Sequence, residues 1–187
     1  MLVSEKVEYI INWIKEYVEN TNFQPITLVI GVSGGVDSAV TSTLAAKTGL
    51  KTIAVSMPIK QNDLQHDLSL RHLEWLKANF NNVETEVINL DNVFFSFESL
   101  MKNFDNSLAF ANSRSRFRMI TLYQIAQSNK GLVLGTGNKV EDFGVGFFTK
   151  YGDGGVDISP LADCKKTQVW EMATKMSIIQ DIIDAQP

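Results

Sequence analysis

The chain has 187 residues, of which 44% are hydrophobic and 20% are charged, values that are typical of a globular domain with its own core. The formal net charge of -4 gives no broad basic field, which argues against nucleic-acid and anionic-membrane partners. Cys164 is the single cysteine, so an internal disulfide and a multi-cysteine zinc site are both excluded. Such cysteine usage favours a reducing, cytoplasmic compartment.

The first twenty residues carry charges every few positions, a pattern that predicts neither a signal peptide nor a membrane span. Their apolar residues recur at spacings of three and four, which predicts an amphipathic helix. These residues are Val3, Val7, Ile10, Ile11, Ile14 and Val18. The apolar stripe of this helix belongs either to the core or to a contact between subunits.

Short apolar runs alternate with helical patterns along the rest of the chain. The runs predict strands at residues 26–32, 51–57, 83–89 and 131–136, because they are rich in β-branched residues or alternate in polarity. Between them, helical periodicity predicts helices at residues 38–47 (closed by Gly49), 64–80 and 108–127, with a further helix before residue 105. A short helix is expected near the end of the chain.

This alternation predicts an α/β fold, an open parallel sheet with helices on both faces, as in Rossmann-like proteins. Ligands of such folds bind beyond the carboxyl ends of the strands. Two polar segments fall at these ends, one at residues 33–38 and the other at residues 136–141.

The sequence SGGVDS at residues 33–38 joins a predicted strand to a predicted helix. Its glycines allow a tight turn whose N–H groups form an anion cradle at the helix start, and Ser33 and Ser38 add hydroxyl groups. Asp37 would repel a bare phosphate but suits a Mg²⁺ ion that accompanies it. The alternative is a plain glycine turn. The chain has no G-x-x-x-x-G-K-[ST] sequence, so a kinase-type phosphate loop is not indicated.

SGGVDS after a buried strand resembles the pyrophosphatase loop of the N-type ATP pyrophosphatases, the adenine nucleotide alpha-hydrolase type of fold. These enzymes activate a substrate by cleaving ATP between its α and β phosphates. Residues 135–173, from GTGNKVEDFG onward, resemble the signature region of NAD synthetases, and NSRSRFRM at residues 112–119 resembles a helix of the same family. The resemblance therefore selects one branch of the superfamily.

The resemblance implies a ligase that amidates deamido-NAD with ammonia through an adenylated carboxylate, with release of AMP and pyrophosphate. It implies Mg²⁺ on Asp37 and Glu141, catalytic roles for Asp37 and Lys166, and deamido-NAD contacts at Arg116, Lys150 and Asp157. The residues that it places around ATP are Gly31, Val32, Ser33, Gly34, Gly35, Val36, Asp37, Ser38, Thr136 and Lys166.

Relatives in this family are homodimers that share the dinucleotide site, so a homodimer is expected. Residues 1–187 are interpreted as one NAD synthetase domain whose C-terminal segment is incomplete, and no nucleophilic cysteine region precedes it. The expected nitrogen donor is free ammonia, although a separate glutaminase subunit remains an alternative.

Several residues near these motifs receive expectations of their own. Arg114 and Arg118 share a helix face apart from Arg116, which predicts a solvated or ion-paired surface. Phe147 and Phe148 are expected in the core rather than against the nicotinate ring. Ser56 stands where many relatives have an arginine, and Gln61 is expected to contact the nucleotide. Cys164 is expected to be a structural thiol, and residues 149–155 are expected to form a substrate lid.

Two rival functions remain open. The first is a different ATP-pyrophosphatase-type synthetase, which acts on another nucleotide or on tRNA; the low number of cysteines and the acidic charge disfavour the tRNA version. The second is a non-catalytic adenine-nucleotide-binding module on a similar sheet, which the fold alone allows. Two metal-ligand carboxylates together with a second anion site favour the enzyme.

Overall fold

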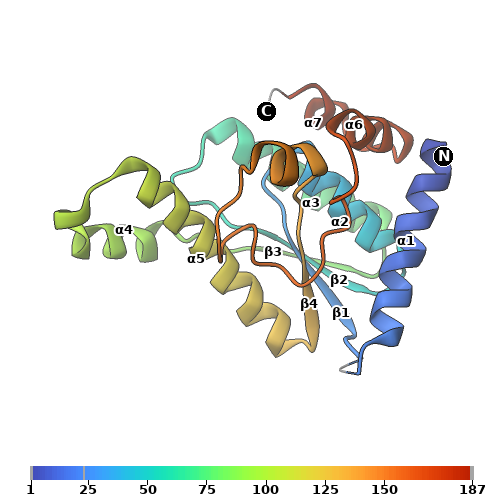
Figure 1. Ribbon diagram of the computed structural model, residues 1–187, viewed down its shortest axis with the longest axis horizontal. Coiled ribbons are helices and arrows are strands. Elements are labelled where there is room, and N and C mark those ends of the chain that lie inside the picture. Colours follow the sequence, from blue (N-terminus) through green and yellow to red (C-terminus); the bar gives the residue numbers. More distant parts are fainter. Residues whose placement is uncertain (1, 23, 186–187) are drawn as a thin grey trace.

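The computed structural model describes residues 2–22 and 24–185, and these form one sheet with helices packed on both of its faces (Figure 1). The strands are β1 (Thr27–Gly31), β2 (Lys51–Ser56), β3 (Val83–Val87) and β4 (Gly131–Leu134). The helices are α1 (Val3–Asn20), α2 (Val36–Lys47), α3 (Asp63–Asn79), α4 (Asp91–Leu100), α5 (Ser107–Ser128), α6 (Lys166–Lys175) and α7 (Gln180–Asp184). A 3-10 turn at Lys102–Phe104 and a π-helical turn at Val140–Val145 complete the elements.

All strands of the sheet run parallel in the order β3-β2-β1-β4. Alternate residues of β1 point to opposite faces: Leu28 and Ile30 pack toward α1, α2 and α6, whereas Val29 packs toward α5. Every described strand residue of β1 except its last is buried, as a central parallel strand requires. The α/β fold class and the predicted strands and helices are thereby confirmed.

The apolar stripe of α1 belongs to the core. Its buried residues Val7, Ile10, Ile11, Ile14 and Val18 join the same cluster as residues of α2 and α6. The stripe is therefore not available as a subunit contact. Among the described residues, no helix is long and apolar enough to cross a membrane.

On the opposite face, α5 packs along β1 and β4, while α4 and the first turns of α5 project away from the sheet (Figure 1). Phe94 of α4 is fully buried against the ring edges of Phe110 and Phe117 of α5, which ties this projection to the body. The carboxyl ends of β1, β2 and β4 open toward the start of α5, and this edge holds the site described below.

Candidate active site

The SGGVDS loop leaves β1 and turns directly into α2, whose N-cap is Gly35. Gly34 has a φ of 91°, and a Cβ on it would lie 2.3 Å from the carbonyl oxygen of Gln65 in α3. Only glycine fits this turn without moving α3. The Ser38 hydroxyl accepts a hydrogen bond from the Ser33 amide (3.2 Å) and donates one to the Gly35 carbonyl (2.9 Å), so it holds the loop together from within.

Three predicted site residues converge beside this loop from distant parts of the chain. The Lys166 ammonium, at the first residue of α6, contacts the Asp37 carboxylate and lies 2.9 Å from Glu141 Oε1. The other Asp37 oxygen accepts a hydrogen bond from Asn138 Nδ2 at 2.9 Å. Asn138 is fully buried, and its side-chain Oδ1 accepts hydrogen bonds from the backbone amides of Val140 and Glu141. Asn138 therefore positions both carboxylates.

The local charges in this cluster are predominantly acidic. Burial works to lower the pKa of Lys166, but its bonds to Asp37 and Glu141 outweigh burial and raise that pKa above its ordinary value. Burial, together with the charges of Asp153, Glu141 and Asp37, raises the pKa of Asp142. The cluster thus favours a bound positive charge.

A divalent cation is compatible with this arrangement. The Asp37 and Glu141 carboxylates already share one ammonium, so their oxygens converge on a single point where a cation is held. No group of three or more His, Cys, Asp or Glu side chains suited to a metal occurs among the described residues. A site of two carboxylates fits Mg²⁺, which keeps several waters and shares phosphate ligands.

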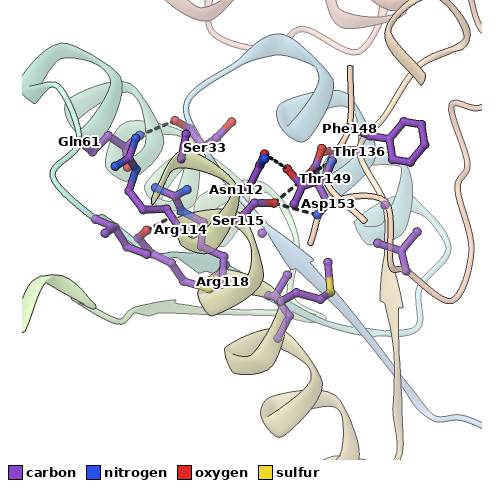
Figure 2. A pocket seen from close by; sticks show the side chains of 18 of the residues that line it. Ser33, Gln61, Asn112, Arg114, Ser115, Arg118, Thr136, Phe148, Thr149 and Asp153 are labelled. Atoms are coloured by element: carbon purple, nitrogen blue, oxygen red, sulfur yellow. Dashed lines mark hydrogen bonds between the residues drawn. The ribbon is translucent and has the colours of Figure 1, made fainter. Parts of the chain in front are cut away.

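A cavity of about 730 Å³ opens at the carboxyl ends of β1, β2 and β4 (Figure 2). Its floor is apolar, with Met57, Met119, Leu122 and Leu134, while polar side chains from five segments line its rim. Figure 2 shows Ser33 and Gln61 joined by a hydrogen bond, with Arg114 and Arg118 nearby and Asn112 beside Thr149. An apolar cavity of this size with a few polar groups suits a nucleotide.

The predicted ATP-binding residues lie partly at the main cavity and partly at the charged cluster around Lys166. Gly31, Val32, Ser33 and Thr136 line the cavity. Asp37 and Lys166 form the charged cluster, and the rest of the loop connects the two places. The cavity lining leaves out Gly34, Gly35, Val36 and Ser38, which instead shape the turn and the start of α2.

The three predicted deamido-NAD residues do not line this cavity. Arg116 Nε donates a hydrogen bond to the Lys150 carbonyl at 3.0 Å, and the Lys150 ammonium lies 5.0 Å from the Tyr151 ring centroid. Asp157 accepts hydrogen bonds from Tyr123 Oη (3.0 Å) and the Val133 amide (2.7 Å). Burial and Asp157 raise the pKa of Tyr123 to about 12, so this phenol remains a donor.

A second, smaller hollow of about 430 Å³ lies on this other side of α5. Tyr123 and Tyr151 line it, which connects it to Asp157 and to the Lys150 segment. Lys150 and Asp157 therefore contact residues that line this hollow, and Arg116 contacts Lys150, but none of the three lines it.

The expectation for Arg114 and Arg118 was wrong. Both arginines line the main cavity, and neither has a carboxylate within ion-pair distance in residues 2–22 and 24–185. The spacing argument separated the two helix faces correctly but could not show that the face of Arg118 turns toward the ends of β1 and β2.

The core expectation for Phe147 and Phe148 was also wrong. Their exposed fractions are 79% and 51%, and both line the main cavity. Each follows the π-helical turn and the left-handed Gly146, which carry the chain out over the cavity rather than into the core.

The remaining residues near the motifs lie in different surroundings. Ser56 is fully buried and shares a hydrogen bond of 2.8 Å with Ser69, whereas Gln61 lines the cavity. Cys164 is buried in the core, and burial raises its pKa, as a structural thiol requires. Residues 149–155 form turns that Ser115 of α5 anchors through Asp153, with an Oγ to Oδ1 distance of 2.6 Å.

Asn138, which contacts Asp37 and the amides of Val140 and Glu141, was not predicted as a residue of the site. Its signal was present: an asparagine directly before a short carboxylate-bearing segment is a typical cap for the N–H groups that follow it. Its second role, as a donor to Asp37, depends on contact between segments 101 residues apart, and no local pattern reports such a contact.

Comparisons with known proteins identify the family and the fold. A family model described as NAD synthase matches residues 6–187. An NH(3)-dependent NAD(+) synthetase from Carboxydothermus hydrogenoformans is 39% identical over 98% of this chain and 74% of that protein. An NMN synthetase structure from Francisella tularensis superposes with a TM-score of 0.90 at 34% identity, covering all of this chain and 76% of that one.

A structure of an NH3-dependent NAD synthetase from Campylobacter jejuni, in complex with the nitrate ion, superposes with a TM-score of 0.87 at 28% identity. It covers 98% of this chain and 77% of that one. The family model spans nearly the whole chain, and the fold is that of the solved NAD synthetase structures. The chain therefore belongs to the NAD synthase family.

Proposed function

We propose that this chain converts deamido-NAD to NAD with ammonia and ATP, and that it releases AMP and pyrophosphate. The observation that carries the proposal is the meeting of Lys166, Asp37 and Glu141 beside the SGGVDS loop, at the edge of a nucleotide-sized cavity. Membership of the NAD synthase family supports the choice of substrates.

The reaction has two steps. An oxygen of the nicotinate carboxylate attacks the α-phosphorus of ATP, and the bond from that phosphorus to the bridging oxygen of pyrophosphate breaks. Ammonia then adds to the activated carbonyl carbon, AMP leaves, and the amide nitrogen gives up a proton. Negative charge moves onto pyrophosphate in the first step, so preorganised positive groups lower its barrier.

The chain supplies such groups at the loop. Lys166 carries a fixed positive charge next to the start of α2, whose unpaired amides favour anions. Asp37 and Glu141 would hold Mg²⁺, which neutralises polyphosphate charge when bound. Lys166 is then free to turn from the carboxylates toward the departing pyrophosphate.

Arg116, Lys150 and Asp157 are proposed to bind deamido-NAD beside the second hollow. Arg116 and Lys150 supply positive charge for its diphosphate, and Tyr123 and Tyr151 supply aromatic faces. The Phe147 and Phe148 rings cover the main cavity, where the nicotinate end must reach the α-phosphate.

We further propose that two copies of the chain form a homodimer and that the enzyme is cytoplasmic. The dimer is supported by exposed apolar side chains on α4 and α5, which continue toward the second hollow through Ile120. The location is supported by the single, buried and unpaired cysteine.

A second acceptor has one specific observation in its favour. The Francisella tularensis structure that superposes with a TM-score of 0.90 is an NMN synthetase, so the same fold can serve a mononucleotide acceptor. Nicotinic acid mononucleotide is therefore the rival acceptor, with the same chemistry at the carboxylate.

The deciding experiment supplies ATP, Mg²⁺ and ammonium with either deamido-NAD or nicotinic acid mononucleotide and resolves the products by mass spectrometry. We expect NAD and AMP in equal amounts from deamido-NAD and a much lower rate with the mononucleotide. Faster turnover of the mononucleotide would replace the proposed acceptor. Formation of ADP, or of AMP without any acceptor, would overturn the proposed chemistry.

A further inference from the structure

Two arginines of α5 face the main cavity four residues apart, at Arg114 and Arg118 (Figure 2). Arg118 is partly buried, and its Nε donates a hydrogen bond of 3.0 Å to the Met57 carbonyl at the end of β2. The Arg114 guanidinium lies 5.7 Å from the centroid of the Phe94 ring. Packing and one hydrogen bond therefore hold both cations at the cavity wall.

This pair lacks the acidic partner that such an arrangement normally has. In the described part of the chain, no carboxylate lies within ion-pair distance of either guanidinium. The nearby cation Lys60 is already paired with Glu98. Arg118 uses one of its five N–H groups on Met57, which leaves donors for a ligand.

Placing two like charges on one helix face at the wall of a cavity is costly. Like charges four residues apart destabilise a helix, and burial of a charge without a partner costs more. Burial and then the charge of Arg114 lower the pKa of Arg118 from its ordinary value, so the charged guanidinium is less favourable here than in water. An anionic ligand in the cavity would remove this penalty.

We propose that Arg114 and Arg118 form a subsite that binds a phosphate group of the nucleotide in the main cavity. Guanidinium groups suit phosphate because their planar N–H pairs match two of its oxygens. This inference rests on the proposed function, since both ATP and deamido-NAD carry phosphates. It assigns a role to a helix face that the catalytic cluster at Lys166 does not use.

The cavity reaches the SGGVDS loop at Ser33, and Gln61 bridges from the arginine side to the Ser33 carbonyl at 2.9 Å. A triphosphate that begins at this loop can therefore extend along the wall that carries Arg118. ATP is the expected source of the phosphate, and deamido-NAD is the source that the experiment must separate from it.

The test measures binding by calorimetry to Arg114→Gln, Arg118→Gln and a matched control, Arg71→Gln. Arg71 lies exposed on α3 and pairs with Asp67 and Asp181, so its replacement removes one arginine charge far from the cavity. The ligands are α,β-methylene-ATP, which resists cleavage between its α and β phosphates, deamido-NAD, and adenosine, which has no phosphate.

We expect Arg118→Gln to weaken α,β-methylene-ATP binding about 10- to 100-fold, and Arg114→Gln to weaken it about 3- to 10-fold. Adenosine binding and the Arg71→Gln variant should stay within about twofold of the unsubstituted protein. Arg114→Gln is the cleaner variant, because among the described residues the Arg114 side chain makes no hydrogen bond that the change would break. If the substitutions weaken binding of deamido-NAD instead of the ATP analogue, the same subsite binds a phosphate of deamido-NAD.

If both variants bind adenosine as much more weakly as they bind the ATP analogue, the arginines only support the cavity wall. If both variants bind every ligand with unchanged affinity, the arginines bind no phosphate. Either result overturns the inference. Its failure is distinguishable from failure of the proposed function. Normal NAD formation with unchanged binding by both variants would reject the subsite alone. Arginine-dependent binding without NAD formation would reject the proposed reaction alone.

Discussion

Lys166 controls the charge balance of the site, because it stands between the Asp37 and Glu141 carboxylates. Without it, the two acidic groups would face each other unpaired in the metal-free protein, and the pyrophosphate would lose a positive contact. The exposed fractions of these side chains, 19% for Lys166 and 16% for Asp37, mean that water screens the loss only partly.

Replacing Lys166 by methionine is therefore expected to lower kcat by about 100- to 1,000-fold. The neighbouring exposed residue provides the control, since Lys165→Met removes the same charge without touching either carboxylate. Steady-state NAD formation at saturating ATP checks the prediction. Equal rates for the two variants would remove Lys166 from the catalytic set.

His72 makes folding sensitive to acid. It is fully buried, its Nε2 lies 2.9 Å from Ser42 Oγ, and burial lowers its pKa from 6.5 to about 4 although the backbone carbonyl of Ala39 opposes the shift. Between pH 6.5 and 4, His72 is therefore protonated in the unfolded chain and neutral in the folded chain. Stability is full above pH 6.5 and is lost as the pH falls toward 4.

Between pH 7 and pH 5 this histidine should remove about 2 kcal/mol from the free energy of unfolding. Urea denaturation at both pH values measures the change, and the same experiment on His72→Gln isolates it from the carboxylates. The variant should lose about 2 kcal/mol less than the unsubstituted protein over this range. An identical pH dependence in the two proteins would contradict the burial argument.

Sequence reasoning at the residue scale succeeded where one motif specifies several positions. SGGVDS located Asp37, and the resemblance supplied Glu141 and Lys166, which the fold does bring together. It failed for Phe148, which follows the π-helical turn, and for Arg118, because helical spacing separates the faces of a helix but does not show which element each face contacts. That information depends on how α5 packs against the sheet.

Among the connecting elements, the turn from β1 into α2 has the strictest geometry. Gly34 and Gly49 both have positive φ angles, 91° and 79°, but only Gly34 lies against another segment. A Cβ at Gly34 would meet the Gln65 carbonyl of α3, whereas one at Gly49 would meet nothing within 4 Å. A side chain at Gly49 would therefore cause backbone strain alone, whereas one at Gly34 would cause backbone strain and a steric clash with α3.

Gly49→Ala should cost about 1–2 kcal/mol of stability through strain alone and leave NAD formation unchanged. Gly34→Ala should cost more, because α3 must move, and it should also lower NAD formation at least about tenfold by displacing the loop. Thermal unfolding and the NAD assay measure the two effects. Equal behaviour of the two variants would show that the loop tolerates the shift.

The strands and most of the helices were predictable at this scale, because their apolar residues repeat with the period of the element. The boundaries of β1 and α5 differ from expectation by only a residue or two. The π-helical turn Val140–Val145 was not predictable. Six residues that carry glycine and two carboxylates show no helical period, and their conformation depends on capping by the buried Asn138.

At the scale of the whole molecule, the parallel α/β class followed from the alternation of strands and helices, but the strand order did not. β4 pairs with β1 rather than with β3, although the chain reaches β4 directly after β3, α4 and α5. This crossover places the ends of β1 and β4 side by side, and the cavity forms there. Local patterns carry no information on which strands become neighbours.

The elements α4, the following 3-10 turn and the start of α5 form a projection (Figure 1). This projection carries exposed apolar side chains. The exposed ones on this projection and farther along α5 are Val93, Phe95, Leu100, Phe104, Leu108 and Ile120. An exposed apolar surface of this kind on a single chain typically marks a protein interface. A second copy of the chain is the proposed occupant, in keeping with the proposed homodimer.

Introducing a charge on this surface should therefore separate the subunits. Phe95→Glu is expected to convert a protein of twice the chain mass to a monomer, because a buried carboxylate without a partner weakens an interface strongly. Tyr9→Glu is the control, since Tyr9 is similarly exposed on α1, at the opposite side of the sheet (Figure 1). Sedimentation equilibrium measures both masses. A monomeric unsubstituted protein, or a dimeric Phe95→Glu variant, would reject this interface. If the Phe95→Glu variant is a monomer that also binds deamido-NAD more weakly, the second hollow depends on the dimer.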